Sequence, residues 1–171
     1  EISLINAPEL VKEKIGKEAC SGLFSEKIVS FIPESKKLIQ NKIEFVLIHF
    51  PKKTLRIRFS KKFFVMDHAE LDRLVAGLAE KTGAKIILNQ PISSLPEGFD
   101  RIVGCDGPFS QIRNALGEPP PKMRLAIQGF FRKSDSSDFV ETWPTKEGFL
   151  WKIPRGGNTE YGIIEKPAAS K

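Results

Sequence analysis

Three short groups of residues in this chain have the types and spacing needed to bind or transform a ligand. The first is Ala19-Cys-Ser-Gly22, where a thiol and a hydroxyl precede a glycine. The second runs from Phe99 to Arg113 and contains Asp106-Gly107, and the third runs from Gly148 to Pro154. A thiol can donate a proton, and a glycine lets the backbone come close to a ligand. These groups are therefore the candidates for chemistry.

The second group predicts a place to seat an anionic cofactor. A short apolar strand leads into Asp106-Gly107, and a helix is expected to follow at once. The free amides at a helix start attract anionic oxygens, and Ser110 and Arg113 lie in that helix. The alternative is a tight strand-to-helix turn that binds no ligand.

The other two groups also have two interpretations each. Cys20 is either a reactive thiol or a small buried hydrophobic residue, and Ser21 with Gly22 either approaches a ligand or caps a helix. On a strand, positions 149, 151 and 153 share one face. Phe149 and Trp151, with Pro154 beside them, therefore either line an apolar substrate tunnel or pack into a core.

Metal and hydrolytic chemistry are not predicted. His49 and His68 are the only histidines, and neither forms a zinc-ligand motif with the two cysteines. His49 lies in an apolar strand, where we expect a hydrogen-bonded packing residue. Cys20 and Cys105 form no disulfide framework, which is typical of a reducing cytoplasm.

Composition indicates a globular chain of 171 residues, with 40% hydrophobic and 28% charged residues. The net charge of +6 favours binding to nucleic acid, to an anionic membrane surface or to a phosphorylated ligand. Basic residues concentrate at 36–42 and 52–62, but too few aromatic residues lie among them for nucleic-acid binding. No apolar run reaches the roughly 20 residues of a membrane-spanning helix. We expect a cytoplasmic protein with peripheral membrane contact as an option.

Hydrophobic periodicity predicts both strands and helices. Helices are expected over 20–32, from Asp67 to Gly83 and from Pro108 to Gly117, with the capping pair Asp67 and Glu70 making the second the surest. Strands are expected over 1–5, 43–50, 54–59, 63–66, 84–88, 99–104, 123–131, 138–142, 149–153 and 160–164.

Taken together, these elements resemble the middle of a flavoprotein with the para-hydroxybenzoate hydroxylase fold, and most of all the geranylgeranyl reductase family. The matching runs are 19–25, 65–75, 103–113 and 149–154. The chain departs from the family pattern at His68, Leu71, Cys105, Phe149 and Ile153. Asn6 stands where an acidic ribose ligand is expected, and the glycine-rich pyrophosphate turn is absent. We therefore expect the interior portion of a longer enzyme.

The resemblance implies an α+β or α/β fold, with part of a Rossmann-like FAD-binding domain and a mostly antiparallel β-sheet substrate domain. The first would span 1–120, with a β-rich segment inserted at about 40–66, and the second 121–171. It implies FAD as cofactor, NAD(P)H or another reductant as electron donor, and an isoprenoid or lipid substrate.

The resemblance also implies a role for each candidate residue. Cys20 would lie near the reacting double bond as the catalytic thiol. Phe149, Trp151 and Pro154 would line the substrate channel. The cofactor contacts would be Ser21, Gly22, Ile92 through its backbone at the adenine, Asp106, Gly107, Ser110 and Arg113.

Two other functions stay open. One is an FAD-dependent aromatic monooxygenase of the same fold, and the other is a non-catalytic module that binds an apolar ligand or a protein and does not retain the cofactor. Both enzyme functions depend on one expectation, namely that the turn at 106–107 and the loop at 20–22 converge on a single flavin.

Overall fold

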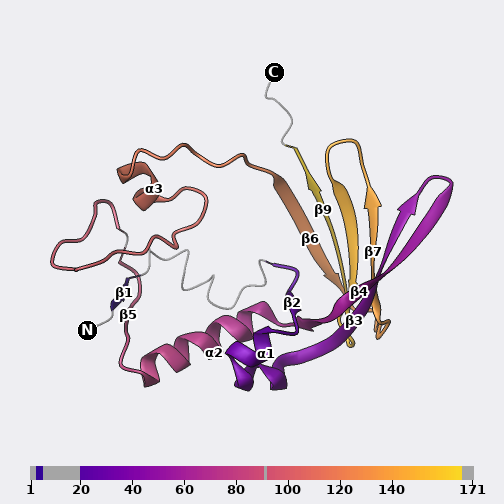
Figure 1. Ribbon diagram of the computed structural model, residues 1–171, viewed down its shortest axis with the longest axis horizontal. Helices are drawn as coiled ribbons and strands as arrows, with labels where there is room; N and C mark the ends of the chain where they lie inside the picture. The colour runs from indigo at the N-terminus through magenta and orange to yellow at the C-terminus, as the bar shows by residue number, and fades with distance from the viewer. Residues whose placement is uncertain (1–2, 6–19, 91, 167–171) are drawn as a thin grey trace. The chain divides into compact units, whose positions relative to one another are not determined.

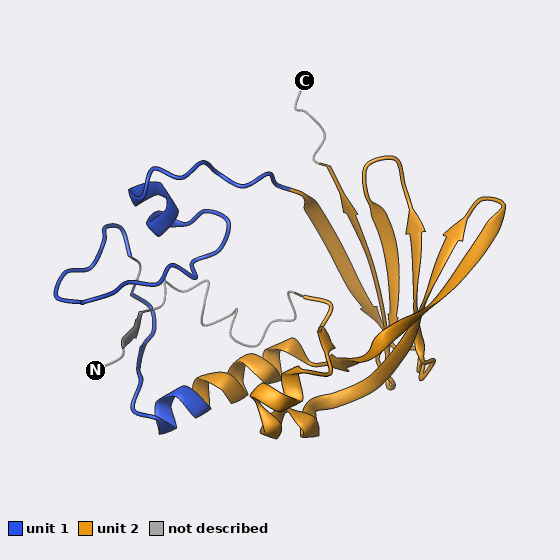
Figure 2. Ribbon diagram, viewed as in Figure 1, with its two compact units in different colours: residues 1–13, 78–123 blue, residues 14–77, 124–171 orange. Residues whose placement is uncertain are grey.

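The computed structural model describes residues 3–5, 20–90 and 92–166, and the chain divides into two compact units (Figure 2). The smaller unit comprises 1–13 and 78–123, and the larger comprises 14–77 and 124–171. Both are built from chain segments that are far apart in sequence. In the larger unit, contacts between such distant segments hold the loop at 20–22.

The larger unit is built on a curled seven-stranded sheet with the strand order β2-β4-β3-β7-β8-β9-β6 (Figure 1). Only β3 and β7 run parallel, and every other neighbouring pair is antiparallel. This mixed α+β architecture with a mostly antiparallel sheet confirms the predicted fold class. The strands are β2 (Leu23–Ser25), β3 (Ile39–Phe50), β4 (Lys53–Met66), β6 (Leu125–Phe131), β7 (Phe139–Pro144), β8 (Phe149–Pro154) and β9 (Thr159–Glu165).

The core of this unit joins the two sequence regions that were expected to be separate. Ile43 and Val65, from the segment predicted as an insertion, are buried against Val140 and Ile153. Strand β3 also pairs with β7 over Phe45–Ile48. The segment at 40–66 and the strands after 121 therefore form one sheet. The domain boundary at 120 stays a prediction.

Strand β4 corrects the prediction of two separate strands at 54–59 and 63–66. It is continuous, but its pairing with β3 shifts between Phe45, which faces Arg58, and Ile43, which faces Phe63. Glu44 alone is therefore opposite the four residues 59–62. A bulge of this kind bends a strand without ending it, and the polar Ser60-Lys61-Lys62 interrupts the apolar alternation that had suggested a break.

The smaller unit contains the parallel pair β1 (Ser3–Ile5) and β5 (Lys85–Ile87) and the short helix α3 (Gln111–Ala115). Helix α2 (His68–Lys81) crosses the division between the units at 77–78. The Glu70 amide donates to Asp67 Oδ1 at 3.0 Å, which confirms the predicted start of this helix. Among the described residues, no helix is long and apolar enough to cross a membrane.

The helix predicted over 20–32 is wrong. Leu23–Ser25 instead pairs with Phe63–Val65, because strand hydrogen bonds to a distant segment override the helical spacing of the apolar residues. Within 20–32 only α1 (Ile28–Phe31) is α-helical. It ends just before Pro33, which begins the 3₁₀ helix η1 (Pro33–Leu38).

The strand predicted over 99–104 is also absent. This segment pairs with no strand in the described part of the chain, and Val103 is 82% exposed. Helix α3 begins at Gln111 rather than Pro108, because the N-cap is Ser110. Its hydroxyl accepts a hydrogen bond from the Arg113 amide.

Candidate functional site

The loop Cys20–Gly22, here called the thiol loop, is held against the end of β4. The Gly22 carbonyl accepts a hydrogen bond from the Met66 amide at 2.8 Å. Gly22 is buried with φ +63°, and a Cβ at this position would lie 2.0 Å from the Met66 carbonyl oxygen. Only glycine fits this close approach. Cys20 is exposed at the edge of the loop.

Arg155, which follows β8, holds the same loop from the side of the sheet. Its Nη1 donates to the Ser21 carbonyl at 2.9 Å, and its Nη2 donates to the Met66 carbonyl at 3.0 Å. Nη1 also pairs with Glu160 Oε2 at 2.8 Å, and both side chains are fully buried. The ion pair therefore stands between the thiol loop and strand β9.

Glu160 connects this ion pair to the aromatic face of the sheet. Its Oε1 accepts a hydrogen bond from the Trp151 indole Nε1 at 2.8 Å. The indole lies across Gly162 on β9, where a Cβ would come within 2.1 Å of Trp151 Cζ2. Phe149 is next to it, with ring centroids 6.0 Å apart. Glycine at 162 thus makes room for the indole.

Phe149 borders a shallow cleft of about 240 Å³, which is also lined by Arg124, Glu147, Gly148 and Ile164. Its side chain is 44% exposed, so an apolar ligand has access to it. Pro154 differs from Phe149 and Trp151, since it is fully buried and strand alternation puts it on the other face. Its substrate contact stays a prediction.

The Asp106 turn lies in the smaller unit and is closed by local hydrogen bonds. Asp106 Oδ2 accepts from the Gln111 amide at 2.6 Å and from the Ile112 amide at 3.4 Å. The hydrogen bond with the Ser110 hydroxyl holds the pKa of the Asp106 carboxyl below its usual range. Desolvation opposes this effect, and the Gln111 and Ile112 amides add to it. Asp106 is therefore an ionised cap of α3.

The rest of the turn completes this local structure. Ser110 is buried, and Arg113 Nη1 donates to the Pro108 carbonyl at 3.0 Å. Gly107 has φ +79° and open space where a Cβ would stand. A ligand can therefore reach the Gly107 backbone. Ile92 is half-buried in the segment after β5.

The structure thus groups the predicted residues into two sets. In the larger unit, Arg155 and Glu160 connect Trp151 to the thiol loop with Cys20, Ser21 and Gly22. These two connecting residues were not predicted from the sequence. The other set, in the smaller unit, is Ile92, Asp106, Gly107, Ser110 and Arg113. Convergence of the two sets on one flavin stays a prediction.

One sequence signal could have pointed to the missed pair. Glu160 begins the strand predicted over 160–164 and is followed by the run Tyr161–Ile164, which carries no charge. An acidic side chain that is buried in such a strand needs a buried cation as its partner. Arg155 directly follows the Trp-Lys-Ile-Pro run and is the nearest arginine in sequence.

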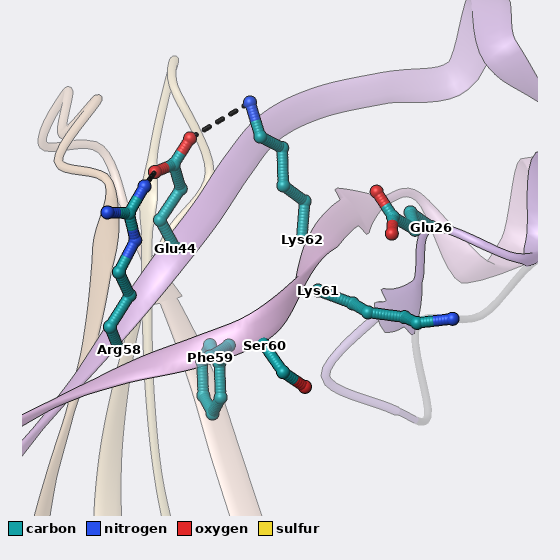
Figure 3. A pocket seen from close by; sticks show the side chains of 7 residues that line it. All are labelled: Glu26, Glu44, Arg58, Phe59, Ser60, Lys61 and Lys62. Atoms are coloured by element: carbon teal, nitrogen blue, oxygen red, sulfur yellow. Dashed lines mark hydrogen bonds and ion pairs between the residues drawn. The ribbon is translucent and has the colours of Figure 1, made fainter.

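The basic residues at 58–62 line a second open hollow of about 340 Å³ with Glu26, Glu44, Phe59 and Ser60 (Figure 3). Figure 3 shows Glu44 between Arg58 and Lys62, to which it is ion-paired at 3.3 Å and 3.0 Å. The hydrogen bond from Lys62, above all, lowers the pKa of Glu44. This hollow contains none of the predicted site residues.

His49 is a hydrogen-bonded packing residue, as predicted. Its Nε2 is 2.8 Å from Glu141 Oε2, its Nδ1 is 3.0 Å from Thr54 Oγ1, and its ring stacks on Trp143. In the part of the chain that the structure describes, no cluster of three potential metal ligands occurs.

Solved structures share this fold at low sequence identity. A geranylgeranyl bacteriochlorophyll reductase-like protein of Thermoplasma acidophilum superposes with a TM-score of 0.74 and 18% identity, over 95% of this chain and 49% of that one. The myxobacterial FAD-dependent halogenase CndH gives 0.71 and 12%, over 99% and 48%. PqsL of P. aeruginosa, in complex with 2-aminobenzoylacetate, gives 0.69 and 11%, over 96% and 54%.

The chain therefore has the fold of FAD-dependent oxidoreductases and spans about half the length of these solved structures. No protein-family model and no curated protein sequence matches it.

The residues present fit a flavin nucleotide on two observations. The Gly107 backbone has open space beside it and a positive φ, so a bulky polar group can approach it closely. The Asp106 carboxylate stays ionised and can accept hydrogen bonds from ligand hydroxyls.

Proposed function

We propose that this chain is the central portion of an FAD-dependent oxidoreductase that reduces carbon–carbon double bonds of an isoprenoid substrate. The observation that carries the proposal is the anchoring of the thiol loop, through Arg155 and Glu160, to the strands that bear Trp151 and Phe149. A proton donor and an apolar aromatic surface thereby belong to one structural unit. Similarity to the reductase-like protein of Thermoplasma acidophilum supports this choice.

Reduction of a carbon–carbon double bond adds one hydride and one proton. FAD, when bound in its reduced form, supplies the hydride, and the electrons come from NAD(P)H or another reductant. Cys20 Sγ holds the proton that passes to the second carbon. Phe149 and Trp151 bind the isoprenoid chain and exclude water from it.

The proposed cofactor contacts include residues from both groups of candidates. Ser21 and Gly22 lie beside the flavin ring, and Asp106 and Gly107 bind the ribose and pyrophosphate portion with Ser110 and Arg113. The Ile92 backbone lies at the adenine. The exposed basic residues of β4 support a peripheral contact with an anionic membrane that carries the lipid substrate.

The test uses the full-length protein, because the chain spans about half of the proteins that share its fold. We expect the purified protein to be yellow or to take up added FAD. We also expect it to reduce a geranylgeranyl substrate under anaerobic conditions with dithionite as reductant. Cys20→Ala should lower turnover by about 10²- to 10⁴-fold, the usual contribution of a positioned proton donor. Cys105→Ala is the matched control. A protein that takes up no FAD contradicts the proposal.

A second candidate function is an FAD-dependent aromatic monooxygenase. It is favoured by the exposed Phe149 next to Trp151, which suits a planar ring, and by similarity to PqsL with its bound 2-aminobenzoylacetate. This enzyme would consume oxygen when given an aromatic substrate and would leave isoprenoid double bonds intact. The anaerobic assay therefore separates the two functions.

A further inference from the structure

Arg155 joins five separate parts of the larger unit. Beyond the carbonyls of Ser21 and Met66 and the carboxylate of Glu160, its Nε donates to Gln40 Oε1 at 3.1 Å. Its guanidinium also lies 5.2 Å from the centroid of the Phe130 ring on β6. One buried cation thus contacts the thiol loop, β3, β4, β6 and β9.

Stability alone does not account for this arrangement. A buried ion pair loses the hydration of both charges, and apolar residues of similar volume are often equally stabilising. An apolar pair, however, would leave the carbonyls of Ser21 and Met66 without these donors. What Arg155 adds is therefore the position of the loop relative to the end of β4.

The same hydrogen bonds form a continuous path from an aromatic side chain to the loop. The Trp151 indole donates to one oxygen of Glu160, and the other oxygen accepts from Arg155. Arg155 then donates to Ser21, the neighbour of Cys20. The indole fills the space above Gly162, and its hydrogen bond is its direct link to Glu160.

We propose that Arg155 is a positioning residue for the thiol loop and that Glu160 couples it to Trp151. A ligand that contacts the indole would thereby shift the position of Cys20. The catalytic meaning of this coupling rests on the proposed function, but the coupling itself does not require a flavin.

Native-state hydrogen exchange in the full chain tests the first part. The reporter is the Met66 amide, which donates to the Gly22 carbonyl, and the control is the Glu44 amide, which donates to Asp138 at 2.7 Å. The variant is Arg155→Met with Glu160→Gln, which leaves no unpaired buried charge and keeps an acceptor for Trp151. We expect exchange at Met66 to accelerate about tenfold or more, as loss of hydrogen bonds from a charged donor implies, with Glu44 unchanged.

A matched pair of tryptophan variants tests the coupling. Trp151→Phe removes the indole donor and should accelerate exchange at Met66 by about three- to tenfold. Trp143→Phe, which removes the tryptophan that stacks on His49, should leave it unchanged.

Three results overturn the proposal: unchanged Met66 exchange in the double variant, equal acceleration at Met66 and Glu44, or equal effects of the two tryptophan variants. Hydrogen exchange is measured here without flavin. A negative result would therefore overturn the coupling through Arg155 and Glu160 and would say nothing about whether the protein binds FAD.

Discussion

The thiol loop and the Asp106 turn are both candidate cofactor contacts, but they are held in different ways. The hydrogen bonds of the turn join residues at most six positions apart, such as Asp106 and Ile112. The loop is held by Arg155, 134 positions away from Ser21. The turn is therefore a local structure, whereas the loop takes its place only when the sheet has formed.

This difference has a consequence for function. A locally closed turn can present Gly107 and Asp106 to a ligand whatever the rest of the chain does. The thiol loop, in contrast, responds to changes in β4, β8 and β9, because its hydrogen bonds end on those strands or next to them. A residue that must be placed accurately against a reacting carbon benefits from such support.

The largest expected difference between the two regions comes from their arginines. Arg155→Ala leaves Glu160 buried without its partner and should lower the free energy of unfolding by about 3–5 kcal/mol. Arg113→Ala, in the local turn, should change it by no more than about 0.5 kcal/mol. Urea denaturation of both variants measures the free energy of unfolding. Equal losses of this free energy in the two variants would contradict the comparison.

The two positive-φ glycines give the next largest contrast. Gly22→Ala introduces both an unfavourable φ and an overlap with the Met66 carbonyl, so we expect a loss of about 3 kcal/mol. At Gly107 the Cβ of an alanine would stand in open space. Gly107→Ala should therefore lower the free energy of unfolding by only about 1 kcal/mol, because of the φ of +79°. Thermal unfolding followed by circular dichroism compares them. A similar cost for both would mean that the loop is free to move away from β4.

The sheet should also contribute more to acid sensitivity than the turn does. Burial raises the pKa of Asp135, but hydrogen bonds from Lys152 and from Ser137 outweigh it and lower the pKa from 3.8 to about 2. A depressed pKa stabilises the fold above the unfolded-state value, and this contribution is lost as the pH falls from about 4 to 2. Asp135→Asn should therefore cost about 2 kcal/mol at pH 7 and almost nothing near pH 2.

Urea denaturation across this pH range checks the prediction, with Asp106→Asn as the exposed control. If the difference between the wild type and Asp135→Asn stays constant from pH 7 to pH 2, the ion pair with Lys152 is not its source.

A small and local effect is expected at the N-cap inside the turn. Ser110→Ala removes the N-cap of α3 and should cost about 1 kcal/mol. Hydrogen exchange should accelerate at Arg113, whose amide bonds the Ser110 hydroxyl, and not at Met66. Faster exchange at both amides would show that the two regions are not independent.

The sequence allowed prediction where the deciding interactions are local. Asp67 and Glu70 mark the start of α2 correctly. The strands predicted over 149–153 and 160–164 agree with β8 and β9 to within one residue at each end. Prediction failed at 20–32, because Leu23–Ser25 forms its hydrogen bonds with Phe63–Val65, which lie about forty residues later.

The candidate site divides in the same way. The turn at Asp106 follows from residues within one short run, so sequence reasoning could place it. Arg155 and Glu160 meet because the register of β8 and β9 pairs Pro154 with Thr159 and Ile153 with Glu160, and no spacing rule predicts that the pair also reaches Ser21.

The central claim is that the thiol loop lies beside the flavin ring of an FAD enzyme. The most direct measurement is the visible absorption spectrum and reduction potential of the full-length protein, compared among the wild type, Cys20→Ala and Cys105→Ala. We predict bound FAD in all three, with spectrum and potential shifted in Cys20→Ala alone. Absence of FAD, or identical flavin properties in Cys20→Ala and the wild type, would contradict the account.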